Sequence, residues 1–266
     1  MMTPSGSDAG RGFPALSAAE GSPGAKDVLI IVPTYNEREN LPALAAQVLE
    51  PFPYRMLVVD DQSPDGTGQV ADELAARYPG RLHVIHRTGE RGLGLSYLEG
   101  FQWALKDGAA LICQMDADLS HDPKYLPDLI AAAASFDLVL GSRYLNGISV
   151  MNWPLRRILL SWFANRYVRA ITGVTTFDTT SGFRCWRREA MARIDWSRFL
   201  SQRYAFTVET VFEVARQGGR VGEVPIIFIE RRQGTSKMSG RVLLESMLMP
   251  WRLILQNRGR VKPPAE

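Results

Sequence analysis

The stretch DVLIIVPTYNE, residues 27–37, decides the fold class of this 266-residue chain. The residues from Val28 to Val32 are all apolar, and we expect Pro33 to end the strand that they form. A short continuous apolar run is typical of a strand that is covered on both faces, as strands are in parallel sheets. The stretch therefore predicts an α/β protein with this segment as a buried strand.

Similar apolar runs alternate with helical patterns over the next hundred residues or so. We predict strands in YRMLVVDD, RLHVIHR, ALICQMDAD and DLVLGSRY, and helices in RENLPALAAQVLE, DGTGQVADELAARY, LSYLEGFQWALKDG and PKYLPDLIAAAA. Asp65 or Thr67 is a suitable N-cap for the second helix, and Gly108 ends the third. This alternation predicts a mainly parallel sheet flanked by helices on both faces.

The pattern changes after residue 150. MNWPLRRILLSWFANRYVRAITG predicts an amphipathic basic helix with leucines and aromatic residues toward one side: Leu155, Leu159, Trp162, Phe163 and Tyr167. AFTVETVFEVARQGG predicts a further helix, VGEVPIIFIERRQG a strand, and VLLESMLMPWRLILQN an apolar helix interrupted by Pro250. We therefore expect a disordered tail over 1–25, an α/β domain over 26–241, and an apolar helix with a tail over 242–266.

Composition and charge restrict the class of ligand. Hydrophobic residues make up 45% of the chain and charged residues 22%, an ordinary globular balance, and a net charge of +3 is too small for a general nucleic-acid binder. Basic residues gather in the second half: Arg156, Arg157, Arg166, Arg169, Arg184, Arg187, Arg188, Arg231, Arg232 and Lys237. Such clustering suits an anionic ligand or a membrane surface, and a solvated basic face is the alternative.

Cysteine usage and the lack of an apolar span indicate the compartment. Cys113 and Cys185 have no CxxC partner, which favours two free thiols in a reducing environment. The first 25 residues are rich in Gly, Ser, Ala and Pro and lack the apolar core of a signal peptide. No segment reaches the roughly 18 to 20 apolar residues of a membrane-spanning helix. We expect a cytoplasmic protein, with contact to a membrane face left open.

Polar residues follow four of the predicted strands. They are PTYNE at residues 33–37, Asp60 and Asp61, the Asp116-Ala117-Asp118 triplet, and Gly141-Ser142-Arg143. Ligands of open α/β sheets bind beyond the carboxyl ends of the strands, so these residues are expected at one rim. Carboxylates two residues apart project from one side of an extended segment and suit Mg²⁺ or Mn²⁺, which also bind substrate phosphates. The alternative is that these are ordinary polar loop residues with no ligand.

Four other site classes lack their motifs. GxGxxG does not follow the first strand, which weighs against a dinucleotide-binding site. GxxxxGK[ST] is absent, which excludes a P-loop nucleotidase, and GxSxG is absent, which weighs against an α/β-hydrolase. No HExxH pattern includes His83, His86 or His121, so a zinc site is not expected.

A series of motifs carries a resemblance to a known family. IVPTYNERENL, VVDDQSPDGT, GLGLSY, MDADLSHDP, GSRY, SGFRCW and GTSKMSG, in this order from about Val28 to Arg241, resemble the family-2 inverting glycosyltransferases of GT-A (Rossmann-like) fold. Within that family they look most like dolichol-phosphate (polyprenol-phosphate) mannose synthases. The resemblance implies a GT-A domain over 26–241 that moves mannose from GDP-mannose to polyprenyl phosphate with inversion, using Mg²⁺ or Mn²⁺.

The resemblance also implies residues for the donor. It assigns the nucleotide to Pro33, Tyr35, Glu37, Val59 and Asp61, although Tyr35 could instead be a core residue. It assigns the metal and diphosphate to Asp116, Ala117 and Asp118, with Asp118 the principal ligand. Ser120 stands where some relatives offer a glutamine to the metal, so a water can intervene there.

Basic residues would complete the donor site. The resemblance places Arg143 near the transferred sugar or the phosphates, so Asp118 and Arg143 are the expected catalytic residues. Arg231 and Lys237 match residues that relatives close over the donor diphosphate. Solvated surface charge is the alternative for these last two.

The resemblance implies a lipid phosphate as acceptor. Arg157 and Ser161 match acceptor-binding positions and lie four residues apart, hence on one helix face. Trp153, Trp162 and Phe163 are expected against the polyprenyl chain or the bilayer. A core-packing helix with ordinary exposed arginines is the alternative. We expect no strong general base, because a phosphate acceptor is already anionic near neutral pH.

Other functions stay open at this point. A polyprenyl-phosphate glucosyl or hexosyl transferase using a UDP-sugar is one, although such relatives commonly carry two C-terminal membrane helices that this sequence lacks. A non-catalytic sugar-nucleotide-binding module and an anionic-lipid scaffold are others. We expect peripheral attachment at the cytoplasmic membrane face, and leave open an integral membrane partner.

Overall fold

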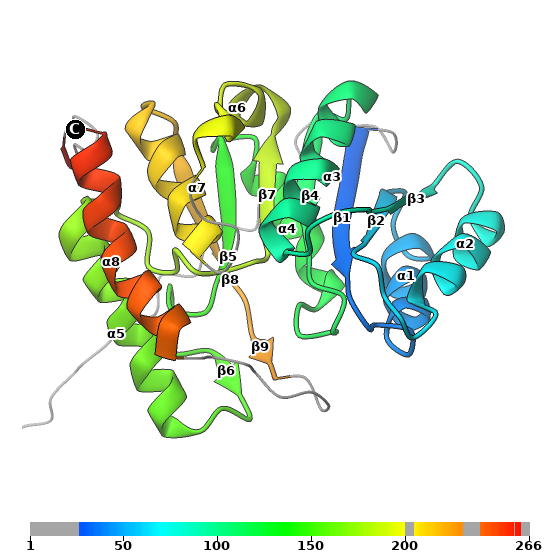
Figure 1. Cartoon of the computed structure of the whole chain (residues 1–266), viewed down its shortest axis with the longest axis horizontal. Coiled ribbons are helices and arrows are strands. Elements are labelled where there is room, and N and C mark those ends of the chain that lie inside the picture. The colour runs from blue at the N-terminus through cyan, green and yellow to red at the C-terminus, as the bar shows by residue number, and fades with distance from the viewer. Residues whose placement is uncertain (1–26, 200–204, 231–239, 258, 262–266) are drawn as a thin grey trace, which may run out of the picture.

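A seven-stranded sheet forms the centre of the molecule (Figure 1). The computed structural model describes residues 27–199, 205–230, 240–257 and 259–261. The strands lie in the order β3-β2-β1-β4-β7-β5-β8. Their bounds are β1 Val28–Thr34, β2 Arg55–Asp60, β3 Leu82–His86, β4 Leu111–Gln114, β5 Leu138–Ser142, β7 Arg184–Arg187 and β8 Val221–Pro225. All neighbours pair in parallel except β7, which runs antiparallel to β4 and β5.

Strand β1 is buried along its whole length, as its apolar sequence predicts. The expectation that Pro33 ends the strand is wrong, because β1 continues to Thr34. Pairing with β4 ends at Ile31, whereas pairing with β2 continues to Thr34 and Asp60. Pro33 therefore lies beyond the last residue that pairs with β4, where a missing N–H breaks no bond between those strands.

Helices cover both faces of the sheet, which confirms the predicted fold class. One face packs against α1 (Leu41–Leu49), α2 (Thr67–Arg77) and α4 (Leu126–Ala132). The other packs against α3 (Leu93–Asp107), α6 (Arg188–Ala192) and α7 (Ala205–Arg216), beside which lie α5 (Leu155–Thr172) and α8 (Gly240–Gln256). Short 3-10 turns occupy Pro123–Tyr125 and Trp196–Arg198.

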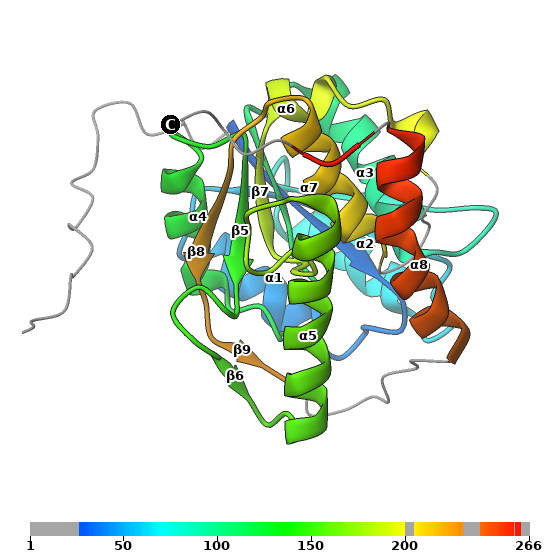
Figure 2. The ribbon, with the colours of Figure 1, turned by 90° about the vertical axis from the view of Figure 1, so that its left-hand side faces the viewer.

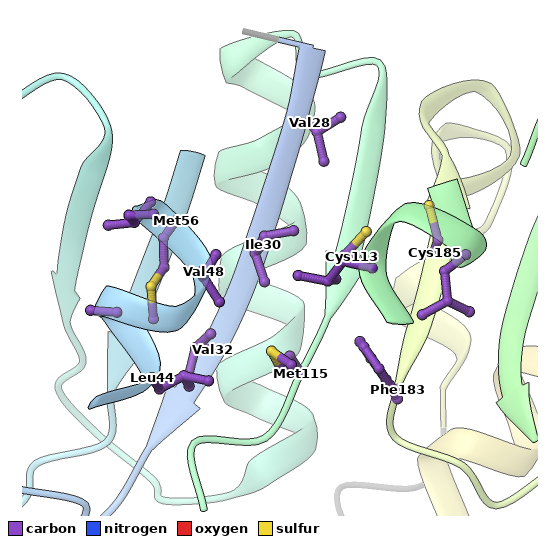
Figure 3. Close-up of a cluster of buried hydrophobic side chains, with 14 of the residues drawn as sticks. Val28, Ile30, Val32, Leu44, Val48, Met56, Cys113, Met115, Phe183 and Cys185 are labelled. Carbon is purple, nitrogen blue, oxygen red and sulfur yellow. The ribbon is translucent and has the colours of Figure 1, made fainter. Parts of the chain in front are cut away.

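The alternation of side chains along β1 builds the two cores. Val28, Ile30 and Val32 belong to the cluster on the α1 side, and Figure 3 shows Ile30 and Val32 beside Val48 and Leu44. Leu29 and Ile31 belong to the opposite cluster with α3. Each residue of this strand thus contributes to one of two apolar layers, which is why the run is unbroken.

Strand β7 is a feature that the helical and apolar patterns did not indicate. It places Cys185 opposite Cys113 of β4, and both thiols are buried and free (Figure 3). A hydrogen bond with Cys185 and burial raise the pKa of Cys113 well above its ordinary value. Cys113 therefore acts as a neutral core residue, and Cys185 is buried beside it.

The C-terminal third differs from its prediction in two places. The segment VGEVPIIFIERRQG divides into β8 and a separate β9 (Phe228–Ile229), which pairs with β6 (Val150–Met151) outside the main sheet. Helix α8 is continuous through Pro250, contrary to the expected interruption, and Met249 and Leu253 anchor it in the core. None of the helices in the described residues has the length and apolar content needed to cross a membrane.

Candidate active site

The carboxyl ends of β1, β2, β4 and β5 lie along one edge of the sheet, at the bottom in Figure 1. The polar residues that follow these strands are therefore brought to a common rim, as the order of motifs predicts. The small β6–β9 sheet and the start of α5 lie at the same end.

Asp60 and Asp61 have different tasks at this rim. Asp60 is buried and accepts hydrogen bonds from Thr34 Oγ1 at 3.0 Å and from Ser63 Oγ at 2.6 Å, so it ties the loop after β2 to the end of β1. Asp61 accepts the main-chain N–H of Gly92 at 2.8 Å and a hydrogen bond from the buried guanidinium of Arg87. Asp61 is thereby held firmly beside the predicted nucleotide site.

Arg87 is a residue that sequence reasoning did not single out. It also donates to Glu99 Oε2 at 3.0 Å and to the carbonyl of Glu90 at 3.1 Å. Its position just after β3 puts it in the same series of strand-end residues as Asp61. That placement is the one signal by which the sequence could have indicated it.

Tyr35 is 46% exposed, so the alternative of a core tyrosine is wrong. Arg91 donates to its hydroxyl at 3.0 Å, and the guanidinium lies 5.0 Å from the ring centroid. The ring is available at the rim to stack on a nucleobase. Glu37 lies in the same loop, where its carboxylate accepts a hydrogen bond from Asn40 Nδ2 at 2.7 Å.

Two of the predicted nucleotide contacts are buried. Pro33 lies inside β1, and the side chain of Val59 is fully buried against Gly100 of α3. Neither side chain is exposed at the rim. Any contribution of Pro33 and Val59 to nucleotide binding would therefore come from their main-chain atoms or from the shape that they give the site.

The loop after β4 holds Asp116 and Asp118 by separate contacts. Tyr97 of α3 donates to Asp116 Oδ1 at 3.2 Å, and the main-chain N–H of Asp116 donates to His121 Nδ1 at 3.1 Å. Asp118 Oδ1 accepts from Ser120 Oγ at 2.6 Å and from the main-chain N–H of Ser120 at 3.1 Å. Neither Tyr97 nor His121 was among the predicted site residues, although both stand in motifs quoted above.

The donor set fits a hard divalent cation. Aspartate oxygens are preferred ligands of Mg²⁺ and Mn²⁺, and such sites commonly take one or two carboxylates and complete their coordination with substrate phosphates and water. In the described part of the chain no group of three or more His, Cys, Asp and Glu side chains is placed to hold a metal ion by itself. Ser120 is buried and its hydroxyl donates to Asp118, one of these carboxylates.

Arg143 is held by a buried carboxylate, Asp178. Its Nε and Nη2 each donate to Asp178 at 2.7 Å, and its main-chain N–H donates to the same carboxylate at 3.0 Å. Burial by itself raises the pKa of Asp178, but the Arg143 charge and its hydrogen bonds outweigh burial and leave that pKa below its ordinary value. Asp178 therefore stays ionised and fixes the orientation of Arg143.

A half-buried acid, Glu223, supports this pair. Glu223 of β8 accepts the main-chain N–H groups of Phe177 at 2.7 Å and Asp178 at 2.9 Å. Burial raises the pKa of Glu223. Two main-chain N–H groups of the loop that carries Asp178 are thus bonded to the Glu223 side chain of the sheet. This fixes the position of the carboxylate that binds Arg143.

Arg157 and Ser161 lie one turn apart on α5, as predicted. Arg157 donates through Nη1 to Glu230, and its guanidinium lies 4.1 Å from the ring centroid of Trp153. Trp153 also lies 5.4 Å from the guanidinium of Arg143 and 5.5 Å from the ring of Phe228. Trp153 therefore packs between the two arginines of the site, whereas we expected it against lipid.

Five of the remaining basic residues fall into three groups. Arg231 and Lys237 lie outside the described residues. Arg184 is fully buried and donates to the carbonyls of Ser181 and Thr179, so it belongs to the core and not to a ligand surface. Burial lowers its pKa to about 9. Arg156 and Arg166 of α5 are exposed, among exposed apolar side chains.

Known proteins match this chain over most of its length. The family model "Glycosyl transferase family 2" matches residues 29–195. A polyprenol monophosphomannose synthase of Mycolicibacterium smegmatis is 49% identical over 221 residues, which are 82% of this chain and 83% of that protein. An undecaprenyl-phosphate mannosyltransferase of Micrococcus luteus is 45% identical over 222 residues, 83% of this chain and 91% of the other.

Solved structures share the fold at lower identity. A mannosyltransferase of Pyrobaculum calidifontis in complex with GDP-Man and Mn²⁺ superposes with a TM-score of 0.63 at 19% identity, over 90% of this chain and 66% of that one. A glucosyl-3-phosphoglycerate synthase of Mycobacterium tuberculosis with Mn²⁺ and uridine diphosphate gives 0.61 at 14% identity, over 90% of this chain and 83% of the other. At these identities the two matches show a shared fold.

Proposed function

Because this chain belongs to glycosyl transferase family 2, we propose that it transfers mannose from GDP-mannose to a polyprenyl phosphate with inversion, giving polyprenyl phosphate mannose. The observation that carries the proposal is the 49% identity, over 221 residues, with a polyprenol monophosphomannose synthase. A second mannosyltransferase with a polyprenyl-phosphate substrate is 45% identical. Transfer of mannose to a lipid phosphate is the reaction common to the two names.

The rim suits a sugar nucleotide in one orientation. The exposed Tyr35 ring would stack on the guanine, and Asp61, held by Arg87, would accept hydrogen bonds from the nucleoside. The diphosphate would then lie over the loop after β4, with Asp116, Ala117 and Asp118. Arg231 and Lys237 would close over the diphosphate in this proposal.

Asp118, supported by Asp116, would hold Mg²⁺ or Mn²⁺ at the diphosphate. When bound, the cation supplies positive charge that stabilises the departing diphosphate. The chain itself prepares the site by fixing each carboxylate. Ser120 orients Asp118, while Tyr97 and His121 hold Asp116.

The acceptor phosphate would bind to Arg157 and Ser161 on α5, beside Arg143. Its oxygen attacks the anomeric carbon of the mannose as the bond from that carbon to the diphosphate oxygen breaks, and the bonding electron pair leaves with GDP. The acceptor is anionic at neutral pH and needs no strong general base. Catalysis would rest on the alignment of the two substrates and on charge stabilisation.

A lipid acceptor requires the site to meet a membrane, and α5 and α8 offer the surface for it. Exposed apolar residues cover both helices: Leu155, Leu159, Leu160, Trp162, Phe163, Tyr167, Met247, Leu248, Trp251 and Leu255. The helices lie side by side in Figures 1 and 2, joined by hydrogen bonds from Tyr167 to the Met247 carbonyl and from Trp251 to the Tyr167 hydroxyl. We assign this α5–α8 surface to peripheral contact with an anionic bilayer.

Incubation of the protein with labelled GDP-mannose or UDP-glucose, a polyprenyl phosphate and Mg²⁺ or Mn²⁺ tests the proposal. Labelled lipid is expected from GDP-mannose alone, with inverted anomeric configuration. Transfer from UDP-glucose would instead indicate a polyprenyl-phosphate glucosyltransferase. Tight metal-dependent nucleotide binding without labelled lipid would point to a non-catalytic module, and activity that needs added membrane protein would indicate an integral partner.

A further inference from the structure

Arg157, which the proposed function places at the acceptor phosphate, already holds an anion in this structure. Its Nη1 donates to Oε1 of Glu230, and the two side chains are 34% and 27% exposed. An acceptor phosphate that approaches the guanidinium therefore meets a carboxylate there. Two anions at one guanidinium repel each other, so the phosphate and Glu230 cannot both bind it at full strength.

The fold, rather than a chance surface contact, brings Glu230 to Arg157. Strand β9 pairs with β6, and the main-chain N–H of Glu230 donates to the Met151 carbonyl at 3.3 Å. β6 leads directly into α5, whose first turn carries Arg157. Figure 2 shows the two short strands beside the same end of α5.

Comparison with the ion pair between Arg143 and Asp178 shows that Glu230 is held more loosely by Arg157. Asp178 binds two nitrogens of the Arg143 side chain, and its own side chain is completely buried. Glu230 binds Arg157 through one nitrogen, and water reaches both side chains. Partly exposed ion pairs are weak, and a phosphate offers more charge and more acceptor oxygens than a carboxylate. Glu230 is therefore displaceable, whereas Asp178 is a permanent partner.

Trp153 keeps Arg157 in place whichever anion is bound. Its ring lies under the guanidinium at 4.1 Å, and the ring of Phe228 packs against the indole at 5.5 Å. A stacked guanidinium retains its fork of in-plane donors for an anion. Exchange of Glu230 for a phosphate would thus need little movement of Arg157.

We propose that Glu230 is an internal competitor for the acceptor phosphate, a role that rests on the proposed function. Its carboxylate neutralises Arg157 while the acceptor site is empty and lowers the affinity of the site for the lipid phosphate. It also returns to Arg157 as the product leaves. The product is a phosphodiester with one negative charge fewer at full ionisation than the acceptor, so this competition promotes product release.

Glu230→Gln tests the proposal, because glutamine keeps the shape and removes the charge. The KM for polyprenyl phosphate and the inhibition constant of polyprenyl phosphate mannose are both expected to fall about two- to five-fold, the range that partly exposed ion pairs are worth. kcat is expected to stay within about twofold. A rise in KM would overturn the proposal, because it would mean that Glu230 positions Arg157 for the phosphate.

Two further variants make the result specific. Glu50→Gln removes a carboxylate from the exposed pair with Arg77, on the α1–α2 side of the sheet, and is expected to leave KM unchanged. In an Arg157→Gln background, Glu230→Gln is expected to have no effect on KM. An equal fall in that background would overturn the proposal, since the effect would then come from general surface charge.

A binding measurement separates this inference from the proposed function. Calorimetric titration with farnesyl phosphate reports affinity without turnover, and Glu230→Gln is expected to lower the dissociation constant by the same factor. A wild-type protein that binds farnesyl phosphate but transfers no mannose would overturn the proposed reaction alone. Equal dissociation constants for wild type and Glu230→Gln would overturn the competition alone.

Discussion

Asp116 and Asp118 are held differently although they follow the same strand. Asp116 accepts from Tyr97 of α3, which lies outside the loop, and its main-chain N–H donates to His121 within the loop. Asp118 accepts from Ser120, two residues away, within its own loop. A change at Asp118 should therefore affect the ligand site with little effect on the fold, which makes it the better residue for testing the metal role.

Asp118→Ala is expected to lower kcat/KM for mannosyl transfer about a hundredfold or more, because several kcal/mol of charge stabilisation on the departing diphosphate is lost. The melting temperature should stay close to that of the wild type. The measurement is transfer of labelled mannose to polyprenyl phosphate, alongside circular dichroism. Asp122→Ala, in the same loop, is the matched control and should keep most of the activity. Near-normal transfer by Asp118→Ala would contradict the metal role.

Asp178→Asn is expected to destabilise the protein by about 3–5 kcal/mol, because it leaves the buried charge of Arg143 without its partner. Denaturant unfolding followed by fluorescence measures this free energy. Mannosyl transfer should fall as well, since Arg143 loses the contacts that orient it. A stability change below about 1 kcal/mol would show that Arg143 finds other partners.

The effect of Asp178→Asn on the free energy of unfolding should depend on pH in a definite direction. The pKa of Asp178 is lower in the folded protein than the ordinary aspartate value of about 3.9. The ion pair therefore stabilises the fold fully above that value, and its contribution decreases as the pH falls toward the folded-state pKa. The difference in unfolding free energy between wild type and Asp178→Asn should be constant from about pH 5 to 7 and shrink below about pH 4. A difference that grew on acidification would contradict this assignment.

At the scale of elements, α5 is important because it joins the proposed acceptor residues to the core of the domain. It begins with exposed residues near Arg157 and ends with Val168, Ile171 and Thr172 buried against the core. Gly173 ends the helix with φ of +83°. A Cβ at Gly173 would lie 2.6 Å from the carbonyl oxygen of Val261, so the C-terminal segment packs directly on this turn.

Gly173→Ala is expected to destabilise the protein by about 2 kcal/mol or more, from backbone strain and from overlap with Val261. For a chain of this size the melting temperature should fall about 2–4 °C for each kcal/mol. Gly147→Ala is the control, since Gly147 has φ of +95° but open space around it. The control isolates the cost of the left-handed conformation, at about 1 kcal/mol. Equal effects of the two changes would rule out the packing contribution.

At the scale of the whole molecule, the active-site rim and the α5–α8 surface are connected through α5. The helix carries Arg157 and Ser161, the residues proposed for the acceptor, and its exposed leucines and aromatic residues continue onto α8. Exposed apolar patches of this extent on a protein mark contact with a membrane or another protein. Arg156 and Arg166 add positive charge to the same surface, which suits anionic lipid.

The double change Leu155→Ser and Phe163→Ser is expected to lower binding to anionic vesicles about tenfold or more, because two side chains that are 69% and 58% exposed lose their apolar contact with lipid. Vesicle sedimentation with phosphatidylglycerol-rich liposomes measures the partition. Leu93→Ser is the control, as Leu93 is an exposed leucine on α3. Unchanged vesicle binding by the double variant would contradict the membrane contact and indicate that this surface binds a protein partner.

The residues that the sequence could not indicate are mostly partners in long-range contacts. Asp61 is bound by Arg87 across 26 residues, Arg143 by Asp178 across 35, and Arg157 by Glu230 across 73. Apart from the position of Arg87 just after a strand, the local sequence does not mark these partners, because a charged residue in a loop has the same sequence pattern whether it is solvated or paired. For Tyr35 the sequence allowed both a core position and a position at the rim, and only its solvent exposure in the structure decided between them.

The sequence by itself determined the parallel sheet, the order of its motifs and the rim at which they meet. Local patterns are sufficient for this, because continuous apolar runs record burial on both faces and parallel strands end at one edge. The tertiary structure alone decided the place of β7, the division of the β8–β9 segment, the outward direction of the apolar residues of α5, and the pairing of Arg143 and Arg157 with their carboxylates. Each of these depends on which distant segments come together, and that choice is made by packing of the whole chain rather than by any local period.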